Sequence, residues 1–158
     1  MNTNVPFDVM REDYSVYEIE NGQILKVKQS ITEIINTNDP DPAKQSKISS
    51  KTISVCTTIK KIDTSDLEES TPDKTVISDQ THELKFKMIK EPVNVFETKI
   101  SILLLNTHIY KIFATTKKDH NGDPIIRFSA VHDLAITKKP LFDDEQLRKN
   151  DPLEKKSD

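Results

Sequence analysis

The sequence has only two glycines, Gly22 and Gly122, and one cysteine, Cys56. Phosphate-binding loops and the strained turns that present nucleophilic serines are built around several glycines, so the sequence has too few glycines for either kind of site. A single cysteine cannot form an internal disulfide, and the CxxC spacing of zinc and redox sites is absent. The sequence therefore argues against a disulfide framework, a nucleotide-binding loop and a nucleophile elbow.

Long apolar runs are also missing. The longest, residues 100–105, is interrupted by Ser101, whereas a membrane helix needs about 20 apolar residues. Residues 1–14 are charged and contain no apolar run, unlike a signal peptide. We therefore expect a soluble protein in the cytoplasm, with no membrane partner.

The basic excess typical of nucleic-acid-binding proteins is absent, because the formal net charge is −3. Apolar residues make up 34% of the 158 residues, which is below the usual share, and they gather in a few runs. This length suits one domain. We predict a flexible N-terminal segment (1–13), a single β domain (14–137) with mobile loops at 36–50 and 63–81, and a charged flexible tail (138–158).

The apolar runs alternate with polar residues in the manner of β-strands. In 52–62 the apolar residues Ile53, Val55 and Ile59 share one face, and in 83–89 Leu84, Phe86 and Met88 do, which is typical of strands that bury one face. Asn-Gly pairs at 21–22 and 121–122 each separate two runs and predict hairpins with type I′ turns. The eight prolines all lie between the runs or at their edges, as a sheet requires.

The run 23–35 fits both a strand and a helical stripe. Its β-branched residues and the preceding Asn-Gly pair favour a strand. Further strands are expected at 93–105, 109–114 and 125–136. The sequence thus predicts an all-β, mostly antiparallel fold with disordered termini, either a meander-type small barrel or a two-layer sandwich.

Residues 100–105 and 109–113 are apolar on both faces of their predicted strands, which a short connection at 106–108 would join. A strand that is apolar on both faces needs a cover on each side. Either the N-terminal segment covers it, or a protein partner or second copy does, since large apolar patches are uncommon on soluble monomers. The candidate interface residues are Ile100, Ile102, Leu104, Ile112 and Phe113.

Basic residues collect on the polar faces of the predicted strands. Such a face could follow a nucleic-acid backbone, but that binding mode also needs aromatic residues for base stacking, and the phenylalanines mostly lie on apolar faces. Lysines also protect sheet edges from unwanted pairing. The residues of the candidate basic face are Lys26, Lys28, Lys60, Lys85, Lys87 and Arg127.

The residue types of enzyme and metal sites are present without the required spacing. The four histidines show no HxH or HExxH pattern. The segment 119–123 supplies alternating oxygens, but its glycine position differs from a calcium loop and favours a polar hairpin turn. We therefore predict no catalytic, cofactor-binding or metal-ligating residue, and no cofactor.

These observations favour a non-catalytic, β-rich module that acts by contact with a protein partner or by self-association. The alternative hypothesis is a small binding barrel for an apolar ligand or for single-stranded nucleic acid. Its apolar lining would be Leu25, Val27, Val55, Phe86, Met88 and Phe128.

Overall fold

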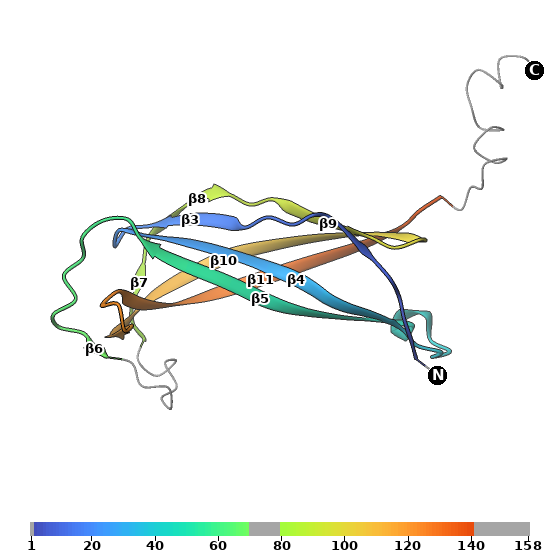
Figure 1. Ribbon diagram of the computed structural model, residues 1–158, viewed down its shortest axis with the longest axis horizontal. Helices are drawn as coiled ribbons and strands as arrows, with labels where there is room; N and C mark the ends of the chain where they lie inside the picture. The colour runs from blue at the N-terminus through green and yellow to red at the C-terminus, as the bar shows by residue number, and fades with distance from the viewer. Residues whose placement is uncertain (1, 70–79, 141–158) are drawn as a thin grey trace, which may run out of the picture.

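The computed structural model describes residues 2–69 and 80–140. Within them, two sheets of mostly antiparallel strands pack face to face into an elongated sandwich, and the sheets do not close into a barrel (Figure 1). The prediction of an all-β antiparallel fold is confirmed, and of its two forms the sandwich is the one observed.

The first sheet is organised around β4 (Gln23–Asn36). One edge of β4 pairs with β5 (Ser46–Thr58) over its whole length. The other edge pairs with β3 (Ser15–Ile19) and β1 (Thr3–Asn4), and β8 (Phe86–Lys90) continues the sheet beyond β3.

The second sheet is organised around β10 (Ser101–Lys118). One edge of β10 pairs with β11 (Pro124–Lys138). Its other edge pairs with three shorter strands, and a fourth strand pairs with β9. These strands are β9 (Val93–Glu97), β7 (Gln80–Leu84), the two-residue parallel β6 (Glu68–Glu69), and β2 (Asp8–Arg11) on β9.

The chain crosses repeatedly between the two sheets along one long side of the sandwich. It passes from β2 in the second sheet to β3 in the first, and later from β8 in the first sheet to β9 in the second. We call this the closed side. The outermost strands on the opposite side are β5 and β11, and no described strand pairs with their outer edges, so we call it the open side.

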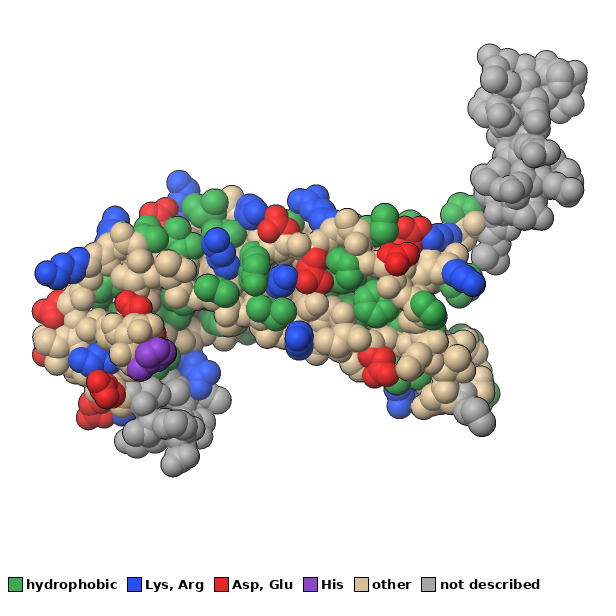
Figure 2. Space-filling model, viewed as in Figure 1, with side chains coloured by type: hydrophobic (Ala, Val, Ile, Leu, Met, Phe, Trp, Pro, Cys, Tyr) green, Lys and Arg blue, Asp and Glu red, His purple; other side chains and the backbone are tan. Residues whose placement is uncertain are grey.

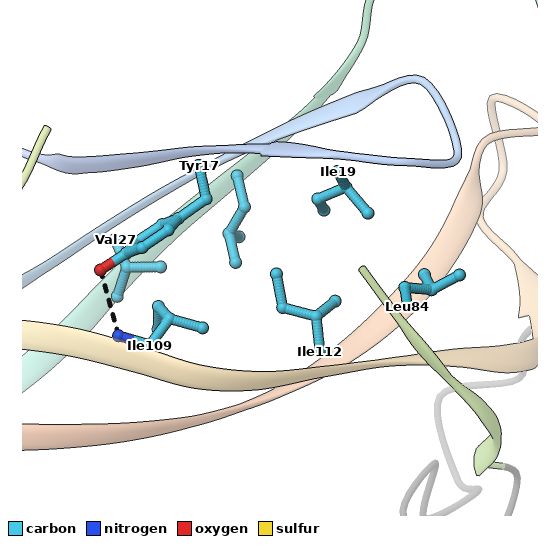
Figure 3. Packing of buried hydrophobic residues seen from close by; sticks show 7 residues of the cluster. Tyr17, Ile19, Val27, Leu84, Ile109 and Ile112 are labelled. Carbon is cyan, nitrogen blue, oxygen red and sulfur yellow. Dashed lines mark hydrogen bonds between the residues drawn. The ribbon is translucent and has the colours of Figure 1, made fainter. Parts of the chain in front are cut away.

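The core lies between the sheets and is made by alternate residues of the central strands. In one half, Tyr17, Leu25 and Val27 of the first sheet pack against Ile109 and Ile112 of the second (Figure 3). In the other half, a second cluster joins the sheets in the same way through Ile31, Ile34, Phe96, Leu103 and Leu105. The alternation seen in the sequence is therefore the inward and outward alternation of a two-layer fold.

The two predicted hairpins are present, but their turns differ from the predicted type. Type I′ needs a positive φ at both central residues, and among the described residues only Gly22 (φ 98°) and Gly122 (φ 83°) have one. The amide of Gly22 donates to the Ile19 carbonyl and that of Gly122 to the Asp119 carbonyl. Each loop is therefore a three-residue turn that ends on a left-handed glycine.

The strand at 23–35 is confirmed, but the predicted orientation of the next strand is reversed. Leu25, which is buried, pairs with Cys56 of β5, whereas the exposed Lys26 pairs with Val55. Val55 consequently lies on the outer face with 46% of its surface exposed. We predicted that the apolar side of this strand faces inward. However, β5 is an edge strand on the open side, and the side that carries most of its serines and threonines faces inward.

Several predicted boundaries need correction. The segment 1–13 contains β1 and β2, so it is part of the sheets. The predicted loop 36–50 includes the last residue of β4, the 3-10 helix Pro42–Lys44 and the start of β5. Residues 106–108 form no connection, because β10 runs through them without interruption. The predicted loop at 63–81 includes β6, and its residues 70–79 lie outside the described residues. Most of the predicted tail, residues 141–158, also lies outside them.

Candidate interaction surface

The closed side is held together by side chains that bind backbone groups of the other sheet. Asn94 accepts a hydrogen bond from the amide of Asp13 (2.8 Å) and donates to its carbonyl (3.0 Å), which fixes the crossing from β2 to β3. Ser15 Oγ donates to the carbonyl of Thr107 across the sandwich (2.8 Å). Asn94 and Ser15 are both buried, so these bonds are shielded from water.

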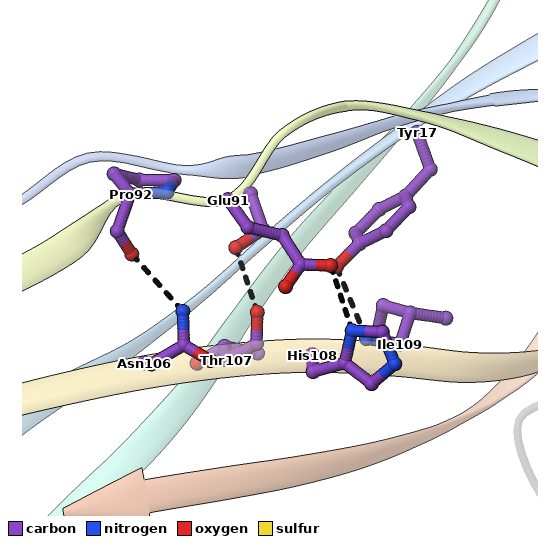
Figure 4. Close-up of polar contacts among 8 residues, drawn as sticks. Tyr17, Glu91, Pro92, Asn106, Thr107, His108 and Ile109 are labelled. Atoms are coloured by element: carbon purple, nitrogen blue, oxygen red, sulfur yellow. Dashed lines mark hydrogen bonds and ion pairs between the residues drawn. The ribbon is translucent and has the colours of Figure 1, made fainter.

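A polar cluster of Tyr17, Glu91 and His108 lies at the second crossing, between β8 and β9 (Figure 4). The Tyr17 hydroxyl donates to Glu91 Oε2 (2.8 Å) and accepts from the amide of Ile109 (3.1 Å). His108 Nδ1 lies 2.7 Å from the same carboxylate oxygen. Sequence reasoning did not find this cluster, because its members are 74 and 17 positions apart and share no motif.

This polar cluster has a structural role, because it acts as a clamp between the two sheets. Burial raises the pKa of Tyr17 to about 12, and the adjacent Glu91 carboxylate acts in the same direction. A base or nucleophile would need its pKa near the working pH, whereas Tyr17 stays protonated and serves as a fixed hydrogen-bond donor. The cluster thus ties the first sheet to β10.

The open side exposes the backbone edges of two long strands. At both ends of the β10–β11 ladder, odd-numbered residues of β11 bond to β10: the amide of Lys139 donates to Ile100, and the carbonyl of Asp123 accepts from Asp119. Because successive residues of a strand point their backbone groups to opposite sides, the even-numbered residues of β11 direct theirs to the open edge. In β5 the even-numbered residues do the same, since Gln45 and Ile59 bond toward β4.

Near the two glycine turns, side-chain hydrogen bonds of Gln23 join the two sheets across the open side. Gln23 is buried and its side-chain amide donates to the carbonyl of Pro124 (3.0 Å) and to Thr58 Oγ1 (3.4 Å). Farther from these turns, Leu134 and Ile136 of β11 point to the inner side but remain 40% and 51% exposed. The β11 edge therefore combines backbone groups that pair with no described strand and partly exposed apolar side chains.

The predicted interface residues do not share one surface. Ile112 is fully buried between the sheets, so it belongs to the core and has to be removed from the candidate interface. Ile102, Leu104 and Phe113 are half-buried on the outer face of β10, because their neighbours Leu103, Leu105 and Ile112 point inward. Ile100 precedes β10 and is 57% exposed.

The predicted basic residues also divide between the sheets. Lys26, Lys28 and Lys87 lie on strands of the first sheet, whereas Arg127 lies on β11 of the second. Lys28 is bound to Glu12 (2.9 Å) and stands over the ring of Tyr14. Lys60 and Lys85 lie outside the strands. Figure 2 shows basic side chains spread over the visible face among apolar and acidic ones, without a continuous basic stripe.

The interior offers no support for the predicted ligand lining. Leu25 and Val27 are packed in the core, and Phe86 and Phe128 pack against it. Val55 and Met88 are exposed on the surface. The six residues therefore do not surround a common space.

Cys56 and the turn at 119–123 are close to each other but form no ligand set. Although Cys56 is partly accessible, desolvation and the charges of Asp123 and Asp119 raise the pKa of its thiol to about 11. The Asp119 carboxylate accepts from the amides of Asn121 and Asp123 (both 2.9 Å), so it caps its own turn. Among the described residues, no group of three or more His, Cys, Asp or Glu side chains is arranged to hold a metal ion.

His132 lies on β11 beside the open edge. Its Nδ1 is 3.1 Å from Thr107 Oγ1, and partial desolvation lowers the pKa of the ring.

In the described part of the chain, no helix is long and apolar enough to cross a membrane. Comparisons of the chain with protein-family models, with curated proteins and with solved structures found no match.

Proposed function

We propose that this chain is a non-catalytic protein-interaction module that binds a partner through the open edge of β11. The observation that carries the proposal is the combination, on one strand, of even-numbered backbone groups that pair with no described strand and of the exposed Leu134 and Ile136. An added strand satisfies such an edge through backbone hydrogen bonds, and its side chains gain contacts on both faces.

The length of β11 supports this use of its edge. Natural proteins usually protect edge strands by keeping them short or by placing prolines and charges along them. β11 spans 15 residues, its only proline is Pro124 at the first position, and its charged residues are limited to Arg127, Asp133 and Lys138. We place the protein in the cytoplasm, where Cys56 would remain a reduced thiol.

Native mass spectrometry of the full chain, purified gently from its source, tests the proposal. We expect a mass above that of one chain, which disappears in the variant Leu134→Pro, because proline removes an amide from the open edge without affecting the bonds to β10. The matched control is Ser54→Pro, which makes the same change on β5. A single-chain mass for the unchanged protein, with no protein partner, would contradict the proposal.

A retained small molecule would instead favour the ligand-binding alternative. Its mass would begin to identify the ligand. A titration with a labelled single-stranded oligonucleotide tests the nucleic-acid alternative, since such binding weakens steeply with salt.

A further inference from the structure

We propose that the partner at the β11 edge is a second copy of this chain, and that the two β11 strands pair antiparallel about a two-fold axis at Ala130. The inference rests on the proposed function and adds to it the identity of the partner and the register. The resulting interface is self-complementary, as a two-fold dimer requires.

The charges of β11 select this register. Arg127 and Asp133 lie on the same face of the strand, each three residues from Ala130. Arg127 Nε is buried without a hydrogen-bond partner, and Asp133 makes no ion pair among the described residues. A two-fold axis at Ala130 places Arg127 of each copy opposite Asp133 of the other, with Cβ atoms about 5 Å apart. The dimer would then contain two Arg127–Asp133 ion pairs, one on each side of the axis.

The same register covers apolar side chains on the inner face. Ile126 of each copy lies opposite Leu134 of the other, and Phe128 lies opposite His132. Leu134 is 40% exposed in the single chain, so this pairing removes apolar surface from water. Desolvation lowers the pKa of His132, which favours the uncharged ring beside the phenylalanine.

The backbone of β11 is oriented for this pairing. In this register, Ile126 faces Leu134, Phe128 faces His132, and the two Ala130 residues face each other. All of these residues are even-numbered, so their amides and carbonyls point to the open edge. The ladder from 126 to 134 would form about ten hydrogen bonds between the two copies. The carbonyl of Pro124 is already bound by Gln23, which limits the ladder at its end.

The β5 edge does not suit self-pairing. Lys47 and Lys51 lie on its outer face, and the strand contains no acidic residue to oppose them. Two paired β5 edges could therefore form no ion pair with each other in any register, whereas β11 carries both signs. The choice of β11 over β5 is therefore made by charge.

Sedimentation equilibrium of the full chain, together with a charge swap, tests the proposal. We expect a concentration-dependent dimer, at least tenfold weaker dimerisation in Arg127→Asp and in Asp133→Arg, and recovery when both substitutions are combined. Within one chain these positions are about 20 Å apart along the strand. Recovery in the double variant must therefore come from contact between two copies.

A cross-link provides a second measurement for a weak dimer. Ala130→Cys in a Cys56→Ser background should form a disulfide-linked dimer on mild oxidation, because Cα atoms in a hydrogen-bonded pair are about 5.5 Å apart. Ser50→Cys on β5, in the same background, is the matched control and should remain monomeric.

The outcomes separate this inference from the proposed function. A monomer that shows no Ala130→Cys cross-link, or a dimer that the charge swap leaves unchanged, overturns the β11–β11 dimer. A complex with a different protein that Leu134→Pro abolishes would then still support a protein-binding edge. A monomer without any such complex would overturn both.

Discussion

The two long sides of the sandwich are built in opposite ways. On the closed side, four short strands alternate between the sheets, and buried polar side chains such as Asn94 and Ser15 bind the backbone across the gap. On the open side, β5 and β11 are long and continuous, and their outer edges meet no other described strand. The difference predicts that substitutions on the closed side cost more stability than substitutions on the open side, which includes the β11 edge proposed to bind a partner.

The largest expected contrast concerns side chains on the two sides. Tyr17→Ala removes a fully buried ring and its two hydrogen bonds, and it should lower the free energy of unfolding by about 3–5 kcal/mol. Val55→Ala on the open side should change it by less than about 0.5 kcal/mol. Urea denaturation measures both, and equal losses would show that the two sides are not energetically different.

Alkaline pH should weaken the closed side. The pKa of Tyr17 is about 12 in the folded protein and 10 for a free side chain, so the folded state holds this proton more tightly. Stability should therefore fall between pH 10 and pH 12, by about 2–3 kcal/mol from Tyr17 alone. Denaturation across this pH range should show a shallower decline in Tyr17→Phe, and parallel curves would contradict the prediction.

Removal of the clamp carboxylate should have a smaller effect. Glu91→Ala leaves the Tyr17 hydroxyl without its acceptor and should cost about 1–2 kcal/mol of unfolding free energy. The open-side control is Gln29→Ala, which breaks the exposed bonds of Gln29 to Ser50 and Thr52 and should cost less than about 0.5 kcal/mol. Thermal denaturation of both variants would sharpen the comparison, and a larger effect for Gln29 would reverse it.

The smallest effect concerns reactivity on the open side. Since the pKa of the Cys56 thiol is about 11, little thiolate is present at pH 8. Its alkylation should be at least roughly tenfold slower than that of a free cysteine, despite its partial exposure. The rate of reaction with a thiol reagent checks this, and Asp123→Asn should raise it. A rate equal to that of free cysteine would show that the site does not desolvate the thiol.

The sequence could predict the sheet class because local patterns encode it. Alternation, the two Asn-Gly pairs and the placement of prolines all reflect short-range chemistry. Whether the apolar residues of an edge strand face inward or outward depends on the register in which the strand pairs with its neighbour. For this reason Val55 was predicted to face inward, although its pairing with Lys26 places it outside.

The candidate surface was only partly predictable. Ile102 and Leu104 were predicted as interface residues from their two-sided apolar run, and they lie half-buried on the outer face of β10. The same pattern also included Ile112, which is buried against the first sheet. The proposed dimer depends on two further features, the edge of β11 that pairs with no described strand and the position of Arg127 on the second sheet. Both depend on which strands are neighbours, and no local pattern records that.

The pairing of β2 and β3 with strands from the second half of the chain has a consequence for synthesis on the ribosome. Asp13 and Asn94 are 81 positions apart, so at about 5–20 residues per second the N-terminal strands wait roughly 4–16 s for their partners. The β3–β4–β5 meander can form during that interval, because its contacts are local. We therefore expect the β3–β4–β5 meander to form before the closed side, which needs β8 and β9 and is completed last.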